Sequence, residues 1–134
     1  DKIRNVGDDI LDVMERAGGH TLREHVAQSE NALIARALSD TVDAVSSFSC
    51  KRIAIKSLKE NLRNNADAIA MWANNSAPGS KKPFYFAHAH VIGRGVLQGK
   101  TNIIEGLNGS LVVLKNDPSQ SLGFKILTAF PEVK

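Results

Sequence analysis

Residues 74–83, with the sequence NNSAPGSKKP, divide the chain into two halves of different pattern. Asparagine, proline, glycine and serine in this stretch favour turns. Before it, apolar residues recur at the three- and four-residue spacing of helices, and after it short runs rich in β-branched and aromatic residues are separated by glycines. This order predicts an α+β fold, with a helical half at about residues 7–75 and a β-rich half at about 83–131.

Length and composition are those of one soluble globular domain covering residues 1–134. The 134 residues are 43% hydrophobic and 23% charged, which excludes a disordered chain and permits a sizeable core. The net charge of +3 is compatible with an anionic partner without identifying one. Cys50 is the only cysteine, so no intramolecular disulfide forms, and no apolar run approaches the roughly 20 residues of a transmembrane helix.

The helical half contains three start or stop signals near two histidines. Gly18 and Gly19 end a first helix, whose apolar positions are Ile10, Val13, Met14 and Ala17. Thr21 and Glu24 have the spacing of a capping box, so a second helix is expected to begin near Leu22. Ser29 is a good N-cap for a helix from 30 to 38, which predicts a break near Gln28.

That break decides whether His25 and Arg36 can act together. In one unbroken helix the two residues would share a face but lie about 16 Å apart along the axis. A break near Gln28 folds His25 back towards Arg36. Further along, the helical pattern of residues 55–73 leaves Lys51, Lys56, Lys59 and Arg63 for an outer basic face, which is either solvated or in contact with an anionic partner.

The β-rich half is expected to contain short strands at residues 84–91, 95–97, 111–115 and 124–128. The last two form a hairpin joined by a polar connection that begins at residues 116–118. Regular alternation along the final strand places Phe124, Ile126, Thr128 and Phe130 on one face. Thr128 and Phe130 are therefore predicted to point the same way.

Metal and nucleotide motifs do not explain this chain. It has no P-loop, no glycine-rich dinucleotide fingerprint and no His-Glu-x-x-His segment. His88 and His90 would share a strand face, but the sequence offers no evident third ligand beside them. We therefore predict no metal and no cofactor.

Cleavage of RNA without a metal requires a base for the 2′-hydroxyl, an acid for the departing oxygen, and donors for the charged phosphorane. Histidine suits both proton transfers, arginine suits phosphate through its planar fork, and threonine adds a neutral donor. These requirements alone do not select particular residues from the polar residues of the chain, since most histidines and arginines are structural or solvated.

Two segments carry a family resemblance that makes the selection. Residues 18–26 (GGHTLREHV) and 123–131 (GFKILTAFP), with Arg36 between them, resemble the RNase A-like toxin domain at the C-termini of bacterial contact-dependent growth inhibition (CdiA) proteins. The resemblance implies N-terminal helices packed on a twisted antiparallel sheet, and an active site at His25, Arg36 and Thr128. A related nuclease fold of the barnase, EndoU, colicin and RelE group is the alternative topology.

The chain departs from the family pattern at two positions. Phe130 stands where the family commonly has tyrosine, and a phenyl ring can stack on a base but cannot donate a proton. Ala27 stands where relatives often have glycine, which alters the helix break without abolishing it. Tyr85, the only tyrosine, replaces the missing hydroxyl only if its strand reaches the cleft. His20 is either a second catalytic histidine or a structural tie in the Gly18-Gly19 turn.

The resemblance also implies a biological role. It predicts a toxin endoribonuclease that cleaves RNA, with tRNA the expected substrate, to a 2′,3′-cyclic phosphate without a metal. The domain would be the C-terminal part of a larger secreted or surface-displayed protein, would act in the cytoplasm of a target bacterium, and would be neutralised by a cognate immunity protein. The alternative function is a non-catalytic RNA-binding or interaction module, since Phe130 removes a hydroxyl.

Overall fold

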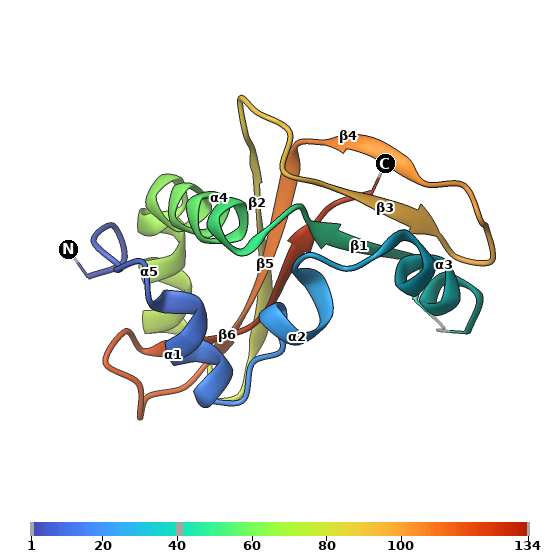
Figure 1. The fold of residues 1–134 in the computed structure, drawn as a ribbon. Helices are drawn as coiled ribbons and strands as arrows, with labels where there is room; N and C mark the ends of the chain where they lie inside the picture. Colours follow the sequence, from blue (N-terminus) through green and yellow to red (C-terminus); the bar gives the residue numbers. More distant parts are fainter. Residues whose placement is uncertain (1, 40–41, 134) are drawn as a thin grey trace.

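The computed structural model describes residues 2–39 and 42–133 and has helices first and antiparallel strands second, with one exception (Figure 1). The helices are α1 (Ile10–Arg16), α2 (Thr21–His25), α3 (Glu30–Ser39), α4 (Lys51–Asn64) and α5 (Ala66–Asn75). The strands are β1 (Ala44–Phe48), β2 (Lys81–Ala87), β3 (Gly93–Leu97), β4 (Ile104–Leu107), β5 (Gly109–Asn116) and β6 (Phe124–Pro131). The predicted α+β class is confirmed.

The exception is β1, which the sequence analysis placed inside the helical half. Its sequence AVSSF does not alternate between apolar and polar residues as a half-buried strand does. Ser46 and Ser47 are buried together with Val45 and Phe48. The Ser46 hydroxyl donates to the carbonyl of Pro131 and the Ser47 hydroxyl to that of Phe48, so both are satisfied inside the protein. Because two of the buried residues are serines, the sequence of β1 lacks the hydrophobic pattern by which a strand is recognised.

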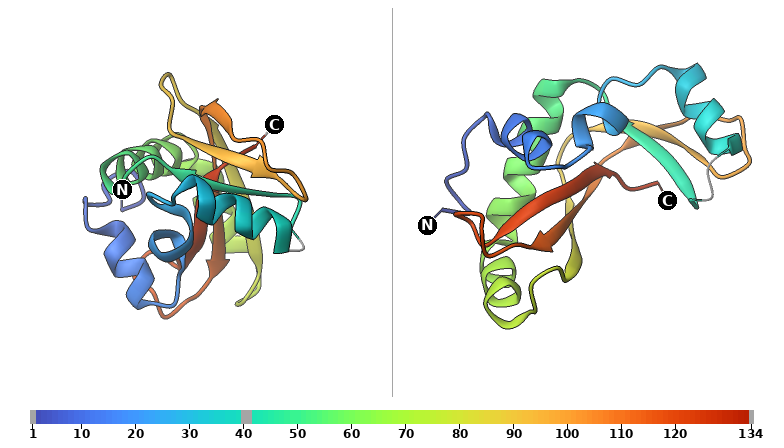
Figure 2. Two further views of the ribbon diagram at one scale, coloured as in Figure 1. Left: turned by 45° about the vertical axis from the view of Figure 1, so that its right-hand side comes forward. Right: turned by 90° about the horizontal axis from the view of Figure 1, so that it is seen from below.

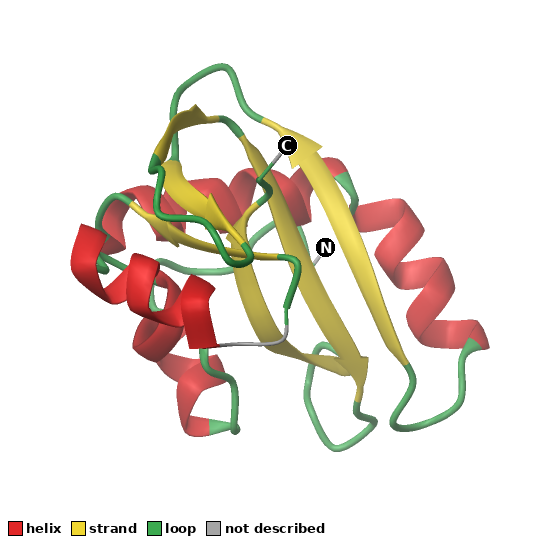
Figure 3. Cartoon of the chain, turned by 90° about the vertical axis from the view of Figure 1, so that its right-hand side faces the viewer, coloured by secondary structure: helices red, strands yellow, loops and turns green. Residues whose placement is uncertain are grey.

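The strands form two three-stranded antiparallel sheets instead of the one sheet expected (Figures 2 and 3). The strand order is β1-β3-β4 in the first sheet and β2-β5-β6 in the second. Helices α4 and α5 cover one face of the second sheet, and Leu58, Leu62 and Ile69 pack there with Val112 and Leu114. A smaller core of Leu33, Ala37, Val45 and Val96 joins α3 to the first sheet.

Strand β6 contains a bulge that corrects the predicted side-chain pattern. Ile126 pairs with Leu114, and Thr128 pairs with Val113, so Leu127 is an extra residue in the ladder. Phe124, Ile126 and Ala129 consequently face the core. Thr128 and Phe130 do point the same way, as predicted, but to the opposite face from Phe124 and Ile126, because one inserted residue reverses the alternation.

The segment between α2 and α3 breaks as predicted. Val26 is extended, and Ala27 has a φ of 54°, in the left-handed region that favours glycine. The Ser29 hydroxyl accepts a hydrogen bond from the amide of Ala32 at 3.1 Å, which confirms it as the N-cap of α3. The capping box was wrong: Thr21 is the first residue of α2, and its buried hydroxyl has no hydrogen-bond partner among the described residues.

Candidate active site

His25 lies at the end of α2, in a pocket between the two sheets. Its side chain is buried, with the residue 9% exposed, and Nδ1 lies 3.0 Å from the carbonyl oxygen of Ser46 in β1. Since a carbonyl only accepts, Nδ1 carries the proton, and Nε2 is left as the acceptor. Burial lowers the pKa of His25 below its ordinary value of 6.5, against the opposing effect of the Ser46 carbonyl. His25 is thus held neutral and ready to accept a proton.

Arg36 reaches this pocket from α3 because the chain reverses at Ala27. Its Nη1 donates to the carbonyl oxygen of Glu24 at 2.7 Å, and its Nη2 lies 3.6 Å from a Glu24 carboxylate oxygen. These contacts join the end of α2 to α3 and orient the guanidinium fork. The structure therefore brings His25 and Arg36 into the same pocket, although they lie on opposite sides of the break in the chain.

Thr128 and Phe130 enter the same pocket from β6. Thr128 is 8% exposed, and its hydroxyl has no hydrogen-bond partner within the described part of the chain. A buried hydroxyl without a partner is uncommon in folded proteins and is a candidate ligand contact. The ring of Phe130 lies 5.3 Å from that of His25, centroid to centroid, at an angle of 46°.

His20 completes the histidine pair predicted from the sequence. Its ring centroid is 6.2 Å from that of His25, and its Nδ1 lies 3.9 Å from the Glu24 carboxylate. Fourteen residues line the pocket, which has a volume of about 540 Å³. They are His20, Glu24, His25, Arg36, Val42, Asp43, Ala44, Ser46, Leu111, Thr128, Phe130, Pro131, Glu132 and Val133.

Comparison with known proteins assigns the chain that forms this pocket to a family. The description "Bacterial CdiA-CT RNAse A domain" belongs to a family profile that matches residues 19–131, a span that includes every pocket histidine and Arg36, Thr128 and Phe130. The chain belongs to the CdiA-CT RNase A domain family. It is a toxin ribonuclease domain.

A solved structure supports the assignment. The fold is similar to that in the crystal structure of a CdiA-CT/CdiI complex from Y. kristensenii 33638, with a TM-score of 0.75 and 26% sequence identity. The match covers 81% of this chain and 95% of the other. A search of curated proteins found no match.

Tyr85 is not among the residues that line the pocket of this CdiA-CT domain. It lies on β2, directly opposite Leu111 of β5, and Leu111 lies opposite Phe130. Directly opposite residues of antiparallel strands share a face, so Tyr85 lies two strands, or about 10 Å, from Phe130 on the same face. The Tyr85 hydroxyl lies against Gly109 of β5, where an added Cβ would be 2.5 Å from it.

The described residues contain two sets of potential metal ligands, each with donor atoms within 4.8 Å of one another. One is His20, Glu24 and His25; the other is His88, His90 and Glu60, so the sequence analysis missed Glu60 as a third donor. In the second set His88 Nδ1 contacts Glu60 at 2.9 Å and Nε2 contacts the Ser110 hydroxyl at 2.8 Å. Both ring nitrogens of His88 are thus engaged in a buried polar network.

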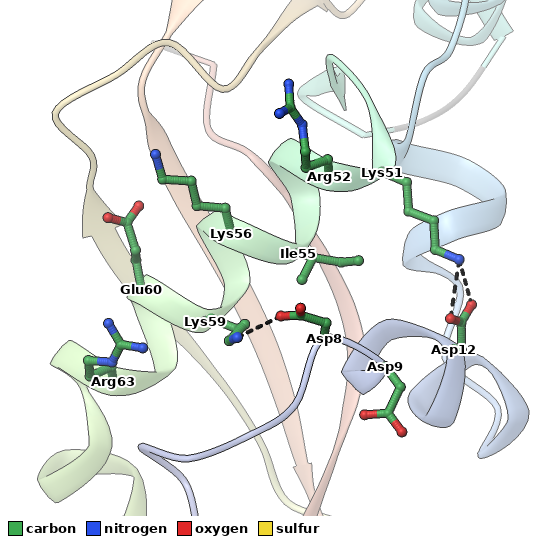
Figure 4. A pocket seen from close by; sticks show the side chains of 10 residues that line it. All are labelled: Asp8, Asp9, Asp12, Lys51, Arg52, Ile55, Lys56, Lys59, Glu60 and Arg63. Carbon is green, nitrogen blue, oxygen red and sulfur yellow. Dashed lines mark hydrogen bonds and ion pairs between the residues drawn. The ribbon is translucent and has the colours of Figure 1, made fainter.

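A larger hollow of about 830 Å³ lies between α1 and α4, and Glu60, the partner of His88, is among its lining residues (Figure 4). Lys51 and Lys59 of its basic wall form ion pairs with Asp12 and Asp8 at 2.9 and 2.6 Å. The basic face predicted for this helix is therefore partly neutralised by α1. No described helix of the domain is long and apolar enough to cross a membrane.

Two contributors to the site were not selected from the sequence. Glu24 was assigned to a helix cap, whereas it contacts Arg36 and lies near His20. Ser46 acts through its backbone carbonyl, so no side-chain pattern signals it. Only the Thr21–Glu24 spacing drew attention to Glu24, and for a different reason.

Proposed function

We propose that this domain is a metal-independent endoribonuclease whose reaction is centred on His25. The observation that supports it most is the His25 contact with Ser46, which leaves Nε2 free in a pocket that also holds Arg36 and Thr128. These groups supply a proton acceptor, a cationic fork and a neutral donor for transesterification of RNA, which leaves the acid for the departing oxygen to be assigned.

In the proposed reaction, Nε2 of His25 accepts the proton of a ribose 2′-hydroxyl as its oxygen attacks the adjacent phosphorus. Arg36 donates to the non-bridging phosphate oxygens, and the Thr128 hydroxyl donates to one of them. The bond to the 5′-oxygen breaks, giving a 2′,3′-cyclic phosphate and a 5′-hydroxyl end. This transesterification step consumes no water and uses no metal ion.

His20 is the proposed acid that protonates the departing 5′-oxygen. Protonated His20 would form an ion pair with Glu24, whose carboxylate lies 3.9 Å from Nδ1. Glu24 also contacts Arg36, so one carboxylate holds both cations near the phosphate. In this role Glu24 is a positioning residue, because it acts through His20 and Arg36.

Phe130 and Tyr85 are proposed to bind the bases of the substrate. Phe130 lies in the pocket beside His25, where it can stack on a base next to the scissile phosphate. Tyr85 is 38% exposed and lies on the same sheet face, where it can contact a base farther along the strand.

The family assignment supports a biological proposal for residues 1–134 as one nuclease domain. We propose that it is the C-terminal part of a larger secreted or surface-displayed effector and cleaves RNA, tRNA first, in the cytoplasm of a target bacterium. The related structure is a CdiA-CT/CdiI complex, which supports a cognate immunity protein as the partner of this chain.

The test is incubation of the purified domain with total bacterial RNA in EDTA, followed by gel analysis and mapping of the fragment ends. We expect discrete fragments, from tRNA first, that end in 2′,3′-cyclic phosphates. The His25→Ala variant should lose cleavage while its far-UV circular dichroism spectrum stays unchanged. His90→Ala, which replaces a histidine outside the pocket, is the matched control and should cleave normally.

Three results would contradict the proposal. Full activity of His25→Ala would remove the assigned base, and cleavage abolished by EDTA would favour a metal nuclease. RNA that binds but stays intact, with and without added divalent metal, would favour the non-catalytic RNA-binding module.

A further inference from the structure

We propose that Lys81, Lys115 and Lys125, here called the lysine row, bind a phosphate of the RNA backbone next to the scissile one. The inference rests on the proposed function, since it extends the substrate path from the pocket across the second sheet. It commits to a single-stranded segment of RNA as the occupant. Its basis is the register of β2, β5 and β6.

The three lysines lie side by side on adjacent strands. Lys81 pairs with Lys115 across β2 and β5, and Lys115 pairs with Lys125 across β5 and β6. Directly opposite residues have Cβ atoms about 4.5–5.5 Å apart, and like charges in such pairs are destabilising. The fold therefore carries two unfavourable lysine pairs in succession, and a bound anion would relieve both.

The lysine row lies on the same sheet face as Thr128. Along β5, Lys115 and Val113 are two residues apart and so share a face, about 7 Å from each other. Val113 is directly opposite Thr128. The row is thus displaced from the Thr128 hydroxyl by two residues along the strand, too far for the scissile phosphate and suitable for a neighbouring phosphate.

On the far side of Thr128, the same face carries aromatic side chains. Tyr85, Leu111 and Phe130 are directly opposite one another in succession across the three strands. The face therefore presents cations on one side of Thr128 and aromatic rings on the other. Single-stranded nucleic acids are bound by this combination of a charged path and stacking side chains.

The ammonium groups of the lysine row still have N–H donors available for a phosphate. Lys125 Nζ donates to the carbonyl of Ala17 at 3.2 Å, which uses one of its three hydrogens. Lys81 and Lys115 have no acceptor within the described residues. Asp117, in the turn after β5, accepts hydrogen bonds from the Ser119 amide and hydroxyl at 3.0 and 2.6 Å. These bonds, and to a smaller extent the charge of Lys125, lower the pKa of Asp117, so its carboxylate partly offsets Lys125 but not Lys81 or Lys115.

The basic residues of α4 are the competing candidates for an RNA path. They lie on the other side of the sheet, since α4 packs against the core face through Leu58 and Leu62. Two of them already pair with aspartates of the α1 segment (Figure 4). Charge and position both favour the lysine row, and Lys56 of α4 supplies a matched control.

The experiment measures binding of a fluorescent single-stranded RNA oligonucleotide to His25→Ala protein, which keeps the RNA intact, over a range of salt concentrations. Adding Lys81→Gln or Lys115→Gln should weaken binding and lower the slope of log affinity against log salt by about 0.7 for each phosphate that is no longer neutralised. Adding Lys56→Gln should leave affinity and slope unchanged. Lys115→Gln should also raise the melting temperature, because it removes two like-charge pairs.

Cleavage by proteins with an intact His25 separates this inference from the proposed function. A dinucleoside monophosphate holds only the scissile phosphate, so Lys115→Gln should leave kcat/KM for this substrate unchanged and lower kcat/KM for longer substrates. If RNA is bound through the lysines but never cleaved, the proposed function fails and the lysine row stands.

The inference is overturned if Lys81→Gln and Lys115→Gln bind RNA with unchanged affinity and salt slope. It is equally overturned if Lys56→Gln weakens binding as much as they do. Loss of affinity for an acidic immunity protein, with RNA binding unchanged, would make the row a protein-docking surface instead.

Discussion

Ala27 is the residue on which the approach of His25 to Arg36 depends. Its positive φ turns the chain between α2 and α3, and its amide donates to the carbonyl of Phe48 at 2.9 Å. An L-residue in this conformation costs roughly 1–2 kcal/mol, and glycine avoids that cost. The departure from the family's glycine is therefore a local strain that longer-range contacts of α2 and α3 hold in place.

Replacing Ala27 by glycine should stabilise the protein. Ala27→Gly removes the strain but increases the entropy of the unfolded chain, so the free energy of unfolding should rise by about 0.5–1 kcal/mol. Urea denaturation measures it. Ala35→Gly, at an exposed position inside α3, is the control and should lower the free energy by about 1 kcal/mol. A destabilised Ala27→Gly protein would show that the left-handed conformation is not strained.

At the scale of elements, the end of β6 crosses the first sheet, which places Phe130 beside His25. The crossing is close at Gly93 of β3: an added Cβ would collide with the carbonyl oxygen of Ser47 and lie 2.8 Å from Cγ of Pro131. Glycine is needed there for close approach, not for a positive φ. The packing of β1, β3 and β6 therefore has no space for a side chain at this point.

The variant Gly93→Ala should force β3 away from β1 at Ser47, and it should also disturb the packing of Pro131 at the end of β6. Because backbone atoms must move, we expect the free energy of unfolding to fall by about 1–3 kcal/mol or more, and RNA cleavage to fall with it. Thermal unfolding and the cleavage assay measure the two effects. Gly7→Ala is the control, since its added Cβ meets only the flexible Asp9 carboxylate. Unchanged stability of Gly93→Ala would argue against this close approach.

At the scale of the whole molecule, two histidines are buried by the assembly of sheets and helices. Burial lowers the pKa of His25 and also that of His88, where the Glu60 hydrogen bond opposes the shift. In the unfolded chain both titrate near 6.5. Below that pH the unfolded state therefore takes up protons before the folded state does.

Stability should consequently fall as the pH decreases. The free energy of unfolding should be largest above pH about 6.5 and decrease from there towards the lowered folded-state pKa values. Urea denaturation at about pH 7.5 and about pH 5.5 measures the decrease, because few carboxylates titrate in that window. His25→Gln, whose amide can still donate to Ser46, should show a smaller decrease. An equal decrease in the variant would mean that His25 does not contribute.

Much of the fold followed from local patterns. Turn residues at 74–83, the stop at Gly18 and the Ser29 cap each depend on neighbouring residues, and the structure confirms the helix ends they predict. Strand β1 was missed because its serines are satisfied by partners far away in the chain. The predicted orientation of Phe124 and Ile126 relative to Thr128 was wrong, because the position of the bulge in β6 depends on its pairing with β5.

The sequence by itself determined the α+β class, the break between α2 and α3, and the common direction of Thr128 and Phe130, because caps, turns and alternation act over a few residues. Tertiary structure alone decided the His25 tautomer, the Glu24 contacts with Arg36, and which face of the second sheet Thr128 occupies. Each of these depends on groups brought together from separate elements. Their geometry is therefore a property of the assembled sheets and helices, not of any one segment.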